Sequence, residues 1–491
     1  MNRSSRNTRL LSDFCLLVAV AMSLSLAGRS HADDTRKESA AKPAAKLYHE
    51  ALRPQFHFSP AKNWTNDPNG LVYYDGEYHL FFQHNPKGIN WGNMTWGHAV
   101  SKDLLHWKQL EHAIYPDALG TIFSGSAVVD HNNTAGFNKG DEKAIVAIFT
   151  YAGGAVTPKV PFTQAIAYST DRGRTFTKYE GNPILGHIMD GNRDPKVFWH
   201  EPTKRWVMAL YLARGKFVLY GSKDLKEWDK LSDVAFPNGH ECPEFFELPI
   251  DGDENNRRWV FWEAGGRHLI GKFDGTTFTP ETEVLRTERG NNCYAGQTWN
   301  DLPEGDKRRI FIGWMAGGRY PGMPFNQQMS FPCELTLRTT EDGVRLFTEP
   351  IDEVKSLRGK HHNASDVSLA NGANPLSNLG GELYDLETVI RPAGAEKITL
   401  NIRGSEVVYD VAKSTLSYKD RVAEVGLVDG KLKLRVLIDR SSFEIFVNDG
   451  RTVMSFCFTP DADNKTFKLT ADGGTATVES LDVYELKSTW P

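Results

Sequence analysis

Short runs of alternating apolar and polar residues, separated by turn residues, dominate the chain from about residue 47 onward. Residues 71–74 and 78–82 are two such runs on either side of Asp75-Gly76-Glu77. This arrangement predicts two β-strands joined by a tight turn. Amphipathic helical periodicity is hard to find anywhere, so the pattern predicts an all-β fold. Further strands of the same kind are expected at 144–150, 205–212, 259–263 and 309–315.

One unit of this pattern recurs along the first two thirds of the chain. Each copy has an apolar strand, a turn that carries an aspartate, and an aromatic residue a few positions later. An aspartate in such a turn accepts hydrogen bonds from the backbone, and the aromatic ring packs between neighbouring sheets. Successive aspartates are 68, 53 and 50 residues apart, a period that suits four-stranded propeller blades. The copies centre on Asp103, Asp171, Asp224 and a degenerate Asp274.

Five such blades fit best into residues 47–350, which we therefore predict to be a β-propeller. The composition shifts after residue 350, where a stretch rich in Asn, Ser, Ala and Gly precedes more alternating strands. Asn448-Asp449-Gly450 is typical of a hairpin turn between two of them. We expect a linker at 351–364 and a C-terminal β-sandwich at 365–491.

The N-terminus carries the pattern of a targeting segment rather than of a folded domain. Arg3, Arg6 and Arg9 precede an apolar run that is too short to span a membrane comfortably, and small residues lead up to Ala32. We predict a secretory signal peptide at 1–32, although a membrane anchor is the alternative. Residues 33–46 are expected to form a flexible tail. The mature protein is then secreted or periplasmic, without a membrane span.

Charge and cysteine content exclude several function classes. The net charge of −5 argues against nucleic acid as a partner, because phosphate binding requires a basic surface. Four cysteines follow the predicted signal, and their spacing matches no zinc site, so we expect neither a metal nor another cofactor. Free thiols are the favoured interpretation, while one disulfide is the alternative. These cysteines are Cys242, Cys293, Cys333 and Cys457.

Three carboxylates stand out because each lies next to proline in a rigid segment rather than in a run of charges. Asp67 lies within Trp64–Gly70, Asp194 follows Arg193, and Glu241 precedes Cys242-Pro243. Acidic residues near the inner strands of different blades would converge on the centre of a propeller. Such carboxylates, flanked by tryptophan, suit the hydrolysis of a glycosidic bond. From spacing alone, a purely structural role in capping turns is as plausible for each of them.

These segments resemble motifs of glycoside hydrolase family 32, the β-fructofuranosidases. Trp64–Gly70 is similar to the nucleophile motif of that family, 193–195 to its transition-state stabiliser motif, and 241–243 to its acid/base motif. The similarity covers about residues 50–490. It implies a five-bladed β-propeller followed by a β-sandwich, and cleavage of levan, inulin or sucrose without a metal. Further similar segments are 123–126, 294–298, 314–315 and, in the sandwich, 439–446.

The resemblance also implies roles for single residues. Asp67 would be the nucleophile, which hydrogen bonds should keep ionised, and Glu241 the general acid and base. Asp194, together with Arg193, would bind the ring hydroxyls and stabilise the transition state. The residues implied to bind substrate are Trp64, Asn66, Gln83, Trp91, Phe123, Ser124, Arg193 and Trp314.

Several alternatives remain open at this level. A fructosyltransferase would use the same residues with a sugar in place of water, and a non-catalytic fructan-binding protein could share the scaffold. A different five-bladed family that acts on arabinans or xylans is the rival at the level of the fold. Residues 320–329 are more similar to exo-inulinases and levanases than to plant invertases. This similarity predicts cleavage of polymeric fructan as well as sucrose. We expect the sandwich to pack against the propeller without joining the chemistry.

Overall fold

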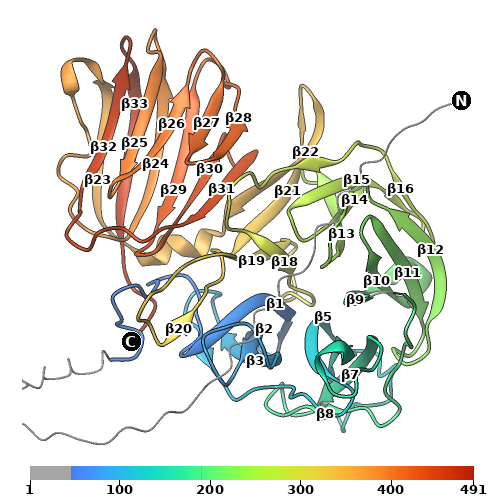
Figure 1. Ribbon diagram of the computed structural model, residues 1–491. Helices are drawn as coiled ribbons and strands as arrows, with labels where there is room; N and C mark the ends of the chain where they lie inside the picture. Colours follow the sequence, from blue (N-terminus) through green and yellow to red (C-terminus); the bar gives the residue numbers. More distant parts are fainter. Residues whose placement is uncertain (1–45, 190) are drawn as a thin grey trace, which may run out of the picture. The chain divides into compact units, whose positions relative to one another are not determined.

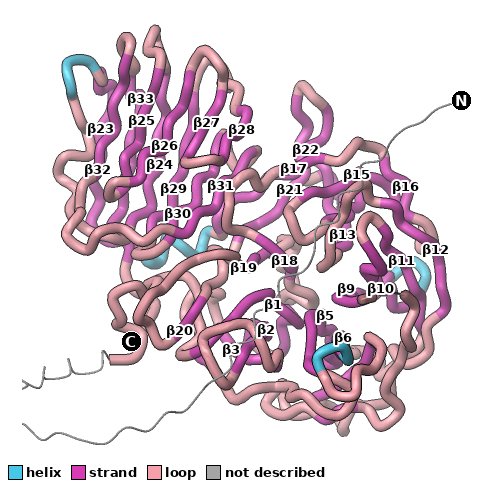
Figure 2. The backbone as a smooth tube through the Cα atoms, in the orientation of Figure 1, coloured by secondary structure: helices cyan, strands magenta, loops and turns pink. Residues whose placement is uncertain are grey.

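The computed structural model describes residues 46–189 and 191–491 of the chain, and Lys46–Pro491 form one compact unit. The predicted signal peptide and nearly all of the predicted tail lie outside the described residues. Strands make up most of the regular structure in the described part, as Figure 2 shows in magenta. No helix among the described residues is long and apolar enough to cross a membrane.

The first half of the unit consists of antiparallel groups of four strands that follow one another along the chain. The strands of the first group are β1 (Asn63–Tyr74), β2 (Glu77–Asn85), β3 (Thr95–Ser101) and β4 (Lys108–Gln109). The second group is β5 (Thr121–Val129), β6 (Ile145–Ala152), β7 (Thr163–Ser169) and β8 (Thr177–Lys178), with the 3-10 turn η1 (Gly153–Ala155) after β6. The third is β9 (Arg193–His200), β10 (Arg205–Ala213), β11 (Lys216–Ser222) and β12 (Asp229–Ala235), with η2 (Glu201–Thr203) after β9.

Two further groups complete this region, and a single parallel pair between Ile250 and Leu337 joins them into one nine-stranded sheet. The fourth group is β13 (Glu244–Ile250), β14 (Asp253–Trp262), β15 (Arg267–Phe273) and β16 (Phe278–Pro280), with β17 (Leu285–Arg286) paired to β15. The fifth is β18 (Tyr294–Thr298), β19 (Ile310–Trp314), β21 (Cys333–Thr340) and β22 (Gly343–Pro350). The short β20 (Phe325–Asn326) runs parallel to β1 instead.

The first strands of these groups face a common centre. β1 contacts β5 and β18, and β5 contacts β9, although they belong to different sheets. Figure 1 shows these strands around the middle of the ring, with the later strands of each group outside. The fold is therefore the predicted β-propeller, and the pairing is consistent with five blades.

The repeated aspartates act as the sequence predicts. Asp103 accepts hydrogen bonds from the backbone N–H groups of Leu105 and His106, at 3.0 and 2.9 Å. Asp224 and Asp274 each accept two such bonds from the residues two and three positions later. The aspartates thus fix the same turn in several blades.

Two packed antiparallel sheets form the C-terminal region, as predicted. One sheet has the order β23-β33-β24-β29-β30-β31 and the other β28-β27-β26-β25-β32. A core of buried aliphatic and aromatic side chains lies between them. The strands are β23 (Arg358–Ser368), β24 (Tyr384–Arg391), β25 (Lys397–Ile402), β26 (Ser405–Asp410), β27 (Thr415–Tyr418), β28 (Arg421–Glu424), β29 (Leu432–Ile438), β30 (Ser442–Val447), β31 (Thr452–Cys457), β32 (Phe467–Asp472) and β33 (Thr477–Leu486).

The predicted linker at 351–364 is wrong for much of its length. The 3-10 helix η3 (Asp352–Leu357) buries Val354 and Leu357, and β23 then starts at Arg358. The polar residues of this stretch misled the prediction because β23 is an edge strand, mostly exposed, that pairs only with β33. Another 3-10 turn, η4 (Ala370–Gly372), follows β23.

A buried histidine joins the sandwich to the propeller. Nδ1 of His57 lies 2.8 Å from Asp439 Oδ2, and its Nε2 lies 2.7 Å from Glu444 Oε2. Asp439 also accepts hydrogen bonds from the backbone N–H groups of Gln55 and Phe56. Asp439 and Glu444 therefore have structural roles, as expected, and the sandwich packs against the propeller.

Candidate functional site

Irregular backbone pairing marks the site end of the inner strands. Asn66 and Asp67 of β1 lie opposite a single residue of β2, and Asp194-Pro195 of β9 lie opposite a single residue of β10. β18 has the same irregularity at Ala295-Gly296, and β5 has an extra residue at Ser124. A bulge of this kind bends a strand and redirects its side chains. The bulges in these four inner strands thus direct the side chains at the bulged positions toward a common site.

The bulge in β5 depends on a glycine. A Cβ atom at Gly125 would lie 2.0 Å from the carbonyl oxygen of Ile148 on the neighbouring strand. Only glycine allows this close approach of two backbones. The hydroxyl of Ser124, the residue before it, donates to Asp67 Oδ2 at 2.6 Å. The segment 123–126, which resembles the family, therefore positions Asp67 through the hydroxyl of Ser124.

Asp67 is held from two sides. Besides the bond from Ser124, the side-chain amide of Asn66 donates to Asp67 Oδ1 at 3.1 Å. Burial raises the pKa of the Asp67 carboxyl, and the hydrogen bonds from Ser124 and Asn66 oppose this rise without cancelling it. The nearby Glu241 adds to the rise. Hydrogen bonding thus favours the ionised form of Asp67, while burial and the charge of Glu241 work against it.

Asp194 lies beside Asp67 and is only 5% exposed. Its Oδ2 accepts a hydrogen bond from the backbone N–H of Cys242 at 3.2 Å, and Arg193 Nε lies 3.6 Å from the same oxygen. Burial raises the pKa of Asp194 to about 7, with Arg193 opposing the rise and the charges of Glu241 and Asp67 adding to it. The two aspartates therefore interact as they titrate.

Glu241 lies in the segment that leads into β13, and each of its carboxyl oxygens has a partner. Arg193 donates from Nε to Glu241 Oε2 at 3.0 Å, and the hydroxyl of Tyr294 donates to Oε1 at 2.8 Å. The Glu241 side chain is 29% exposed, so it borders open space. Arg193 also lies over the ring of Tyr211, with its guanidinium carbon 4.8 Å from the ring centroid. The arginine thus links Glu241 and Asp194.

Aromatic side chains surround this cluster. Trp64 packs edge-on against Trp314, with ring centroids 6.1 Å apart, and its indole N–H donates to Asn66. Trp91 is 55% exposed and lies edge-on to Phe123 at 6.1 Å. All four rings were predicted to bind substrate. Trp64 contacts Asn66, the residue before Asp67, directly.

Gln83 was predicted to bind substrate, whereas Tyr294 was not, and both lie at the site. Gln83 lies on β2 opposite the bulge at Asp67, and its side-chain Nε2 is buried without an acceptor. Tyr294 was not among the predicted site residues, although it belongs to a segment that resembled the family. Its raised pKa, caused first by burial and then by Glu241, keeps the hydroxyl protonated and able to donate. The available signal was that Tyr294 begins a segment that resembles the family.

Three residues of the site have strained backbone conformations. Asp194, Cys242 and Ala295 have φ angles of 64, 52 and 49°, in the left-handed region that residues with a Cβ rarely adopt. Such conformations cost about 1–3 kcal/mol each and persist only where the surroundings enforce them. All four predicted thiols are free, and Cys242 is the one that lies among the carboxylates.

A buried ion pair closes the centre of the propeller beneath this cluster. Lys196 Nζ lies 2.9 Å from Glu244 Oε1, and both side chains are at most 2% exposed. Thr298 accepts a hydrogen bond from Lys196 with its carbonyl oxygen and donates one to Glu244 from its hydroxyl. Three inner strands, β9, β13 and β18, are thereby joined across the axis.

The site consists of three carboxylates, an arginine and a tyrosine, and the buried polar groups of Lys196, Glu244 and Thr298 lie beneath them. Among the described residues, no group of three or more His, Cys, Asp or Glu side chains is arranged to hold a metal ion. Two neighbouring carboxylates, one of them bound by a hydroxyl and an amide, can supply a nucleophile and an acid.

Comparison with known families decides the identity. Residues 57–350 match the glycosyl hydrolases family 32 N-terminal domain, and residues 353–485 match the family 32 C-terminal domain. The chain belongs to glycosyl hydrolase family 32. As a member of this family it is a glycosidase, and its propeller and sandwich correspond to the two family domains.

Relatives of this family 32 chain are similar over nearly its whole length. It is 40% identical to a levanase from Bacillus subtilis, over 91% of this chain and 72% of that protein. It is 32% identical to an extracellular exo-inulinase from Aspergillus awamori, over 90% of this chain and 96% of that protein. A crystal structure of exo-inulinase from A. awamori matches with a TM-score of 0.80, at 31% identity, over 90% of this chain and 100% of that one.

Proposed function

We propose that this chain is a β-fructosidase that releases fructose from levan, inulin and sucrose by a double displacement. The observation that carries the proposal is the meeting of Asp67, Asp194 and Glu241 in one site of a family 32 glycosidase. The 40% identity to a levanase and the similarity to exo-inulinases support fructan as the substrate.

In the proposed first step, the Asp67 carboxylate attacks C2 of the fructosyl unit. The C2–O bond to the leaving group breaks, and Glu241 gives its proton to the departing oxygen. The product of this step is a fructosyl ester of Asp67. In the second step Glu241 removes a proton from water, which attacks C2 and releases fructose and the free carboxylate.

Positive charge builds up at C2 as the leaving group departs. Asp194 lies near Asp67 and is well placed to bind hydroxyls of the ring, so its hydrogen bonds would tighten as the ring flattens. Arg193 holds Glu241 and Asp194 in position through its contacts with both. The unpartnered amide of Gln83 offers a further donor beside the bulge at Asp67.

Segment 320–329 supports the preference for polymers. Within it, β20 pairs with β1 at Trp64, and Gln327 accepts a hydrogen bond from the indole N–H of Trp314. Asn326 donates from its side chain to the carbonyl of Ile89. The segment therefore borders the aromatic side of the site, where units beyond the first fructose would lie.

The decisive experiment follows the products formed from sucrose, inulin and levan over time. Fructose as the only fructose-containing product from inulin and levan, and fructose with glucose from sucrose, supports exo-acting hydrolysis. Oligosaccharides from the polymers would instead indicate cleavage within the chain, and products longer than the substrate would indicate fructosyl transfer. If none of the three substrates gave any product, the proposal would be contradicted. We also propose that the protein is secreted or periplasmic, which fractionation of the producing cells tests directly.

A further inference from the structure

A second cavity lies at the far end of the propeller axis from the carboxylates. It has a volume of about 720 Å³ and is lined by residues at the C-terminal ends of the inner strands, including Val129 of β5 and Trp199 of β9. The site residues on the same strands, Ser124 and Asp194, come five positions earlier in each case. Since a strand rises about 3.3 Å per residue, about 16 Å of strand separates the two places.

The two places are not one continuous pocket. The buried contacts of Lys196 with Glu244 and Thr298 lie between them. Asn300 adds a second polar layer, because its side-chain amide donates to the carbonyl oxygens of Ala127 and Val197. A ligand in the far cavity would therefore not touch the catalytic carboxylates.

An arginine without a carboxylate partner projects into the far cavity. Arg309 donates from Nη1 to the carbonyl oxygen of Trp299 at 3.3 Å, while its buried Nε has no acceptor. Within residues 46–189 and 191–491 it forms no salt bridge. Burial lowers the pKa of Arg309, and the charges of Glu244 and Asp301 oppose this fall without cancelling it. Its Nη2, which forms no hydrogen bond within the described residues, is the donor that a ligand in the cavity can satisfy.

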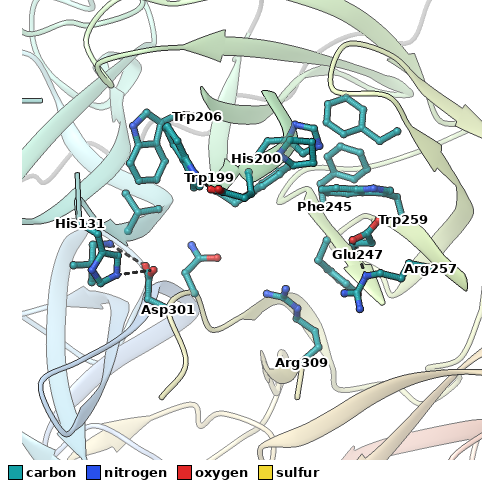
Figure 3. A pocket seen from close by; sticks show the side chains of 18 of the residues that line it. His131, Trp199, His200, Trp206, Phe245, Glu247, Arg257, Trp259, Asp301 and Arg309 are labelled. Carbon is teal, nitrogen blue, oxygen red and sulfur yellow. Dashed lines mark hydrogen bonds and ion pairs between the residues drawn. The ribbon is translucent and has the colours of Figure 1, made fainter. Parts of the chain in front are cut away.

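The two carboxylates near Arg309 interact with residues other than Arg309. Glu247 pairs with Arg257 at 2.8 Å. Asp301 accepts from the backbone N–H of Val129 and lies 3.2 Å from His131 Nε2. Figure 3 shows both of these pairs at the cavity wall, with Arg309 between them and reaching inward.

Aromatic rings form the opposite wall. Trp199 is partly exposed and packs edge-on against the buried Trp206, with ring centroids 5.1 Å apart. Phe198, also partly exposed, packs against Trp259 at 5.3 Å. The rings behind hold the exposed ones rigid, so the wall offers flat apolar faces at a fixed position. Figure 3 shows Trp199 and Trp206 across the cavity from Asp301 and Arg309.

This combination selects the chemistry of a ligand. The charged residues that line the cavity have an excess of negative charge, which disfavours an anion, whereas an apolar ligand would leave Arg309 unsatisfied. They are Glu201, Glu247, Asp274 and Asp301 against Arg257 and Arg309. Hydroxyl groups can accept from the guanidinium and donate to the carboxylates at the same time. A molecule with hydroxyls on its edges and a C–H face for the rings meets every requirement, and the volume lies in the range of small-molecule sites.

We propose that the far cavity is a second, non-catalytic binding site for a neutral oligosaccharide, gripped by Arg309 and stacked on Trp199. The inference does not depend on which glycoside the catalytic site cleaves. If the ligand is a fructan, the site holds the polymer to the enzyme. If it is a glucan, the site holds the enzyme to another polysaccharide.

The test follows the indole N–H signals of the tryptophans by NMR while sugars are added. The protein carries Asp67→Asn so that fructans survive the titration. A Trp199→Phe variant assigns the Trp199 signal by its loss. The sugars are an inulin-type trisaccharide, a levan-type trisaccharide and maltotriose, with sodium sulfate as an anionic control. We expect the Trp199 signal to shift to saturation with at least one sugar and not with sulfate.

Arg309→Gln should then raise the Kd read from the Trp199 signal at least tenfold. Lys307→Gln, which changes an exposed neighbouring cation, is the matched control and should leave that Kd unchanged. The same two substitutions are also made in the protein that keeps Asp67. There, both variants should hydrolyse sucrose as the parent does, which shows that they are folded. If Arg309→Gln does not fold, Arg309→Lys keeps the charge but loses the planar array of donors and should weaken binding in the same direction.

Three results would overturn the proposal. The Trp199 signal could remain unmoved by all three sugars, or it could respond to sulfate rather than to sugar. It could also respond equally in the Arg309 and Lys307 variants. Loss of sucrose hydrolysis in the parent protein would count against the proposed function instead, and would leave the binding measurement intact.

Discussion

The thiol of Cys242 lies 3.4 Å from Asp194 Oδ2 and 3.8 Å from Asp67 Oδ2, so one sulfur atom contacts both buried aspartates. Burial, with the neighbouring carboxylates, raises the pKa of this thiol far above its ordinary value. The thiol is therefore protonated at every working pH. It can act only as a hydrogen-bond donor, and its donation to Asp194 helps to hold down a carboxyl pKa that burial raises.

The first prediction concerns the pH dependence of activity. Asp67 must be ionised to attack, and burial raises its pKa and that of Asp194. Activity should therefore fall, as the pH decreases, through a value above the ordinary range of an aspartate. Cys242→Ala removes a donor from the pair and should move this acid limb to higher pH. Cys242→Ser supplies a hydroxyl donor and should move it back. The measurement is kcat/KM for sucrose against pH, and identical limbs in the three proteins would contradict the assignment.

The second prediction concerns Asp67 itself. Asp67→Asn should lower turnover by a factor on the order of 10⁴ or more, since the nucleophile is lost. The amide has the shape of the carboxylate and can still bond to Ser124, so the Tm should change little. Asp141→Asn, an exposed carboxylate, is the control and should keep full activity. Substantial residual turnover by the Asp67 variant would assign the nucleophile elsewhere.

The third prediction concerns Glu241. Glu241→Gln should reduce sucrose hydrolysis strongly, because the departing oxygen then lacks its proton donor. A fructoside whose leaving group departs without protonation should lose much less in its first step. The comparison is the release of leaving group in the first turnover from both substrates, in variant and parent. Equal losses on the two substrates would show that Glu241 does not act as the acid.

The fourth prediction concerns stereochemistry. A nucleophile and an acid that share one covalent intermediate have their carboxyl groups about 5–5.5 Å apart, and two inversions at C2 give net retention. NMR of the earliest product should therefore show β-fructose before mutarotation. The appearance of α-fructose first would mean that Asp67 activates water instead of attacking.

The fifth prediction concerns the joint between the two regions. Burial alone would lower the pKa of His57, but the hydrogen bonds to Asp439 and Glu444 raise it to about 9. Because the folded protein holds this proton more tightly, the stabilisation is complete below about pH 6.5 and is lost as the pH rises through about 9. The loss amounts to about 3 kcal/mol at most.

His57→Gln should remove this pH dependence and lower the free energy of unfolding at pH 6.5. Denaturant unfolding of both proteins between pH 6 and 10 gives the two curves. His106→Gln, which breaks an exposed His–Asp pair, serves as the control and should follow the parent. Parallel curves for the parent and the His57 variant would contradict the assignment.

Much of the fold could be predicted because it depends on local patterns. The turns at Asp103 and Asp224 need only an aspartate at a fixed offset from the backbone groups it binds. The hairpin at residues 448–450 needs only its turn residues. The linker prediction failed because exposed edge strands lack apolar alternation, so β23 has the composition of a loop.

The composition of the site was also within reach of the sequence, but its geometry was not. The bulges at Asp67 and Asp194 depend on hydrogen-bond register between strands, which leaves no mark on residue type. The contact between His57 and Asp439 joins positions that are 382 residues apart. Arg309 in the far cavity lies among polar residues of the loop that leads into β19, and nothing local distinguishes it from the neighbouring Lys307.

The buried ion pair of Lys196 and Glu244 lies between the catalytic site and the far cavity. A polymer therefore cannot reach Asp67 by threading along the propeller axis from the far cavity. In the proposed reaction, substrate then arrives and fructose leaves on the side of the site that faces away from this ion pair. A fructose that stays bound there would block the next substrate, so free fructose is expected to inhibit competitively.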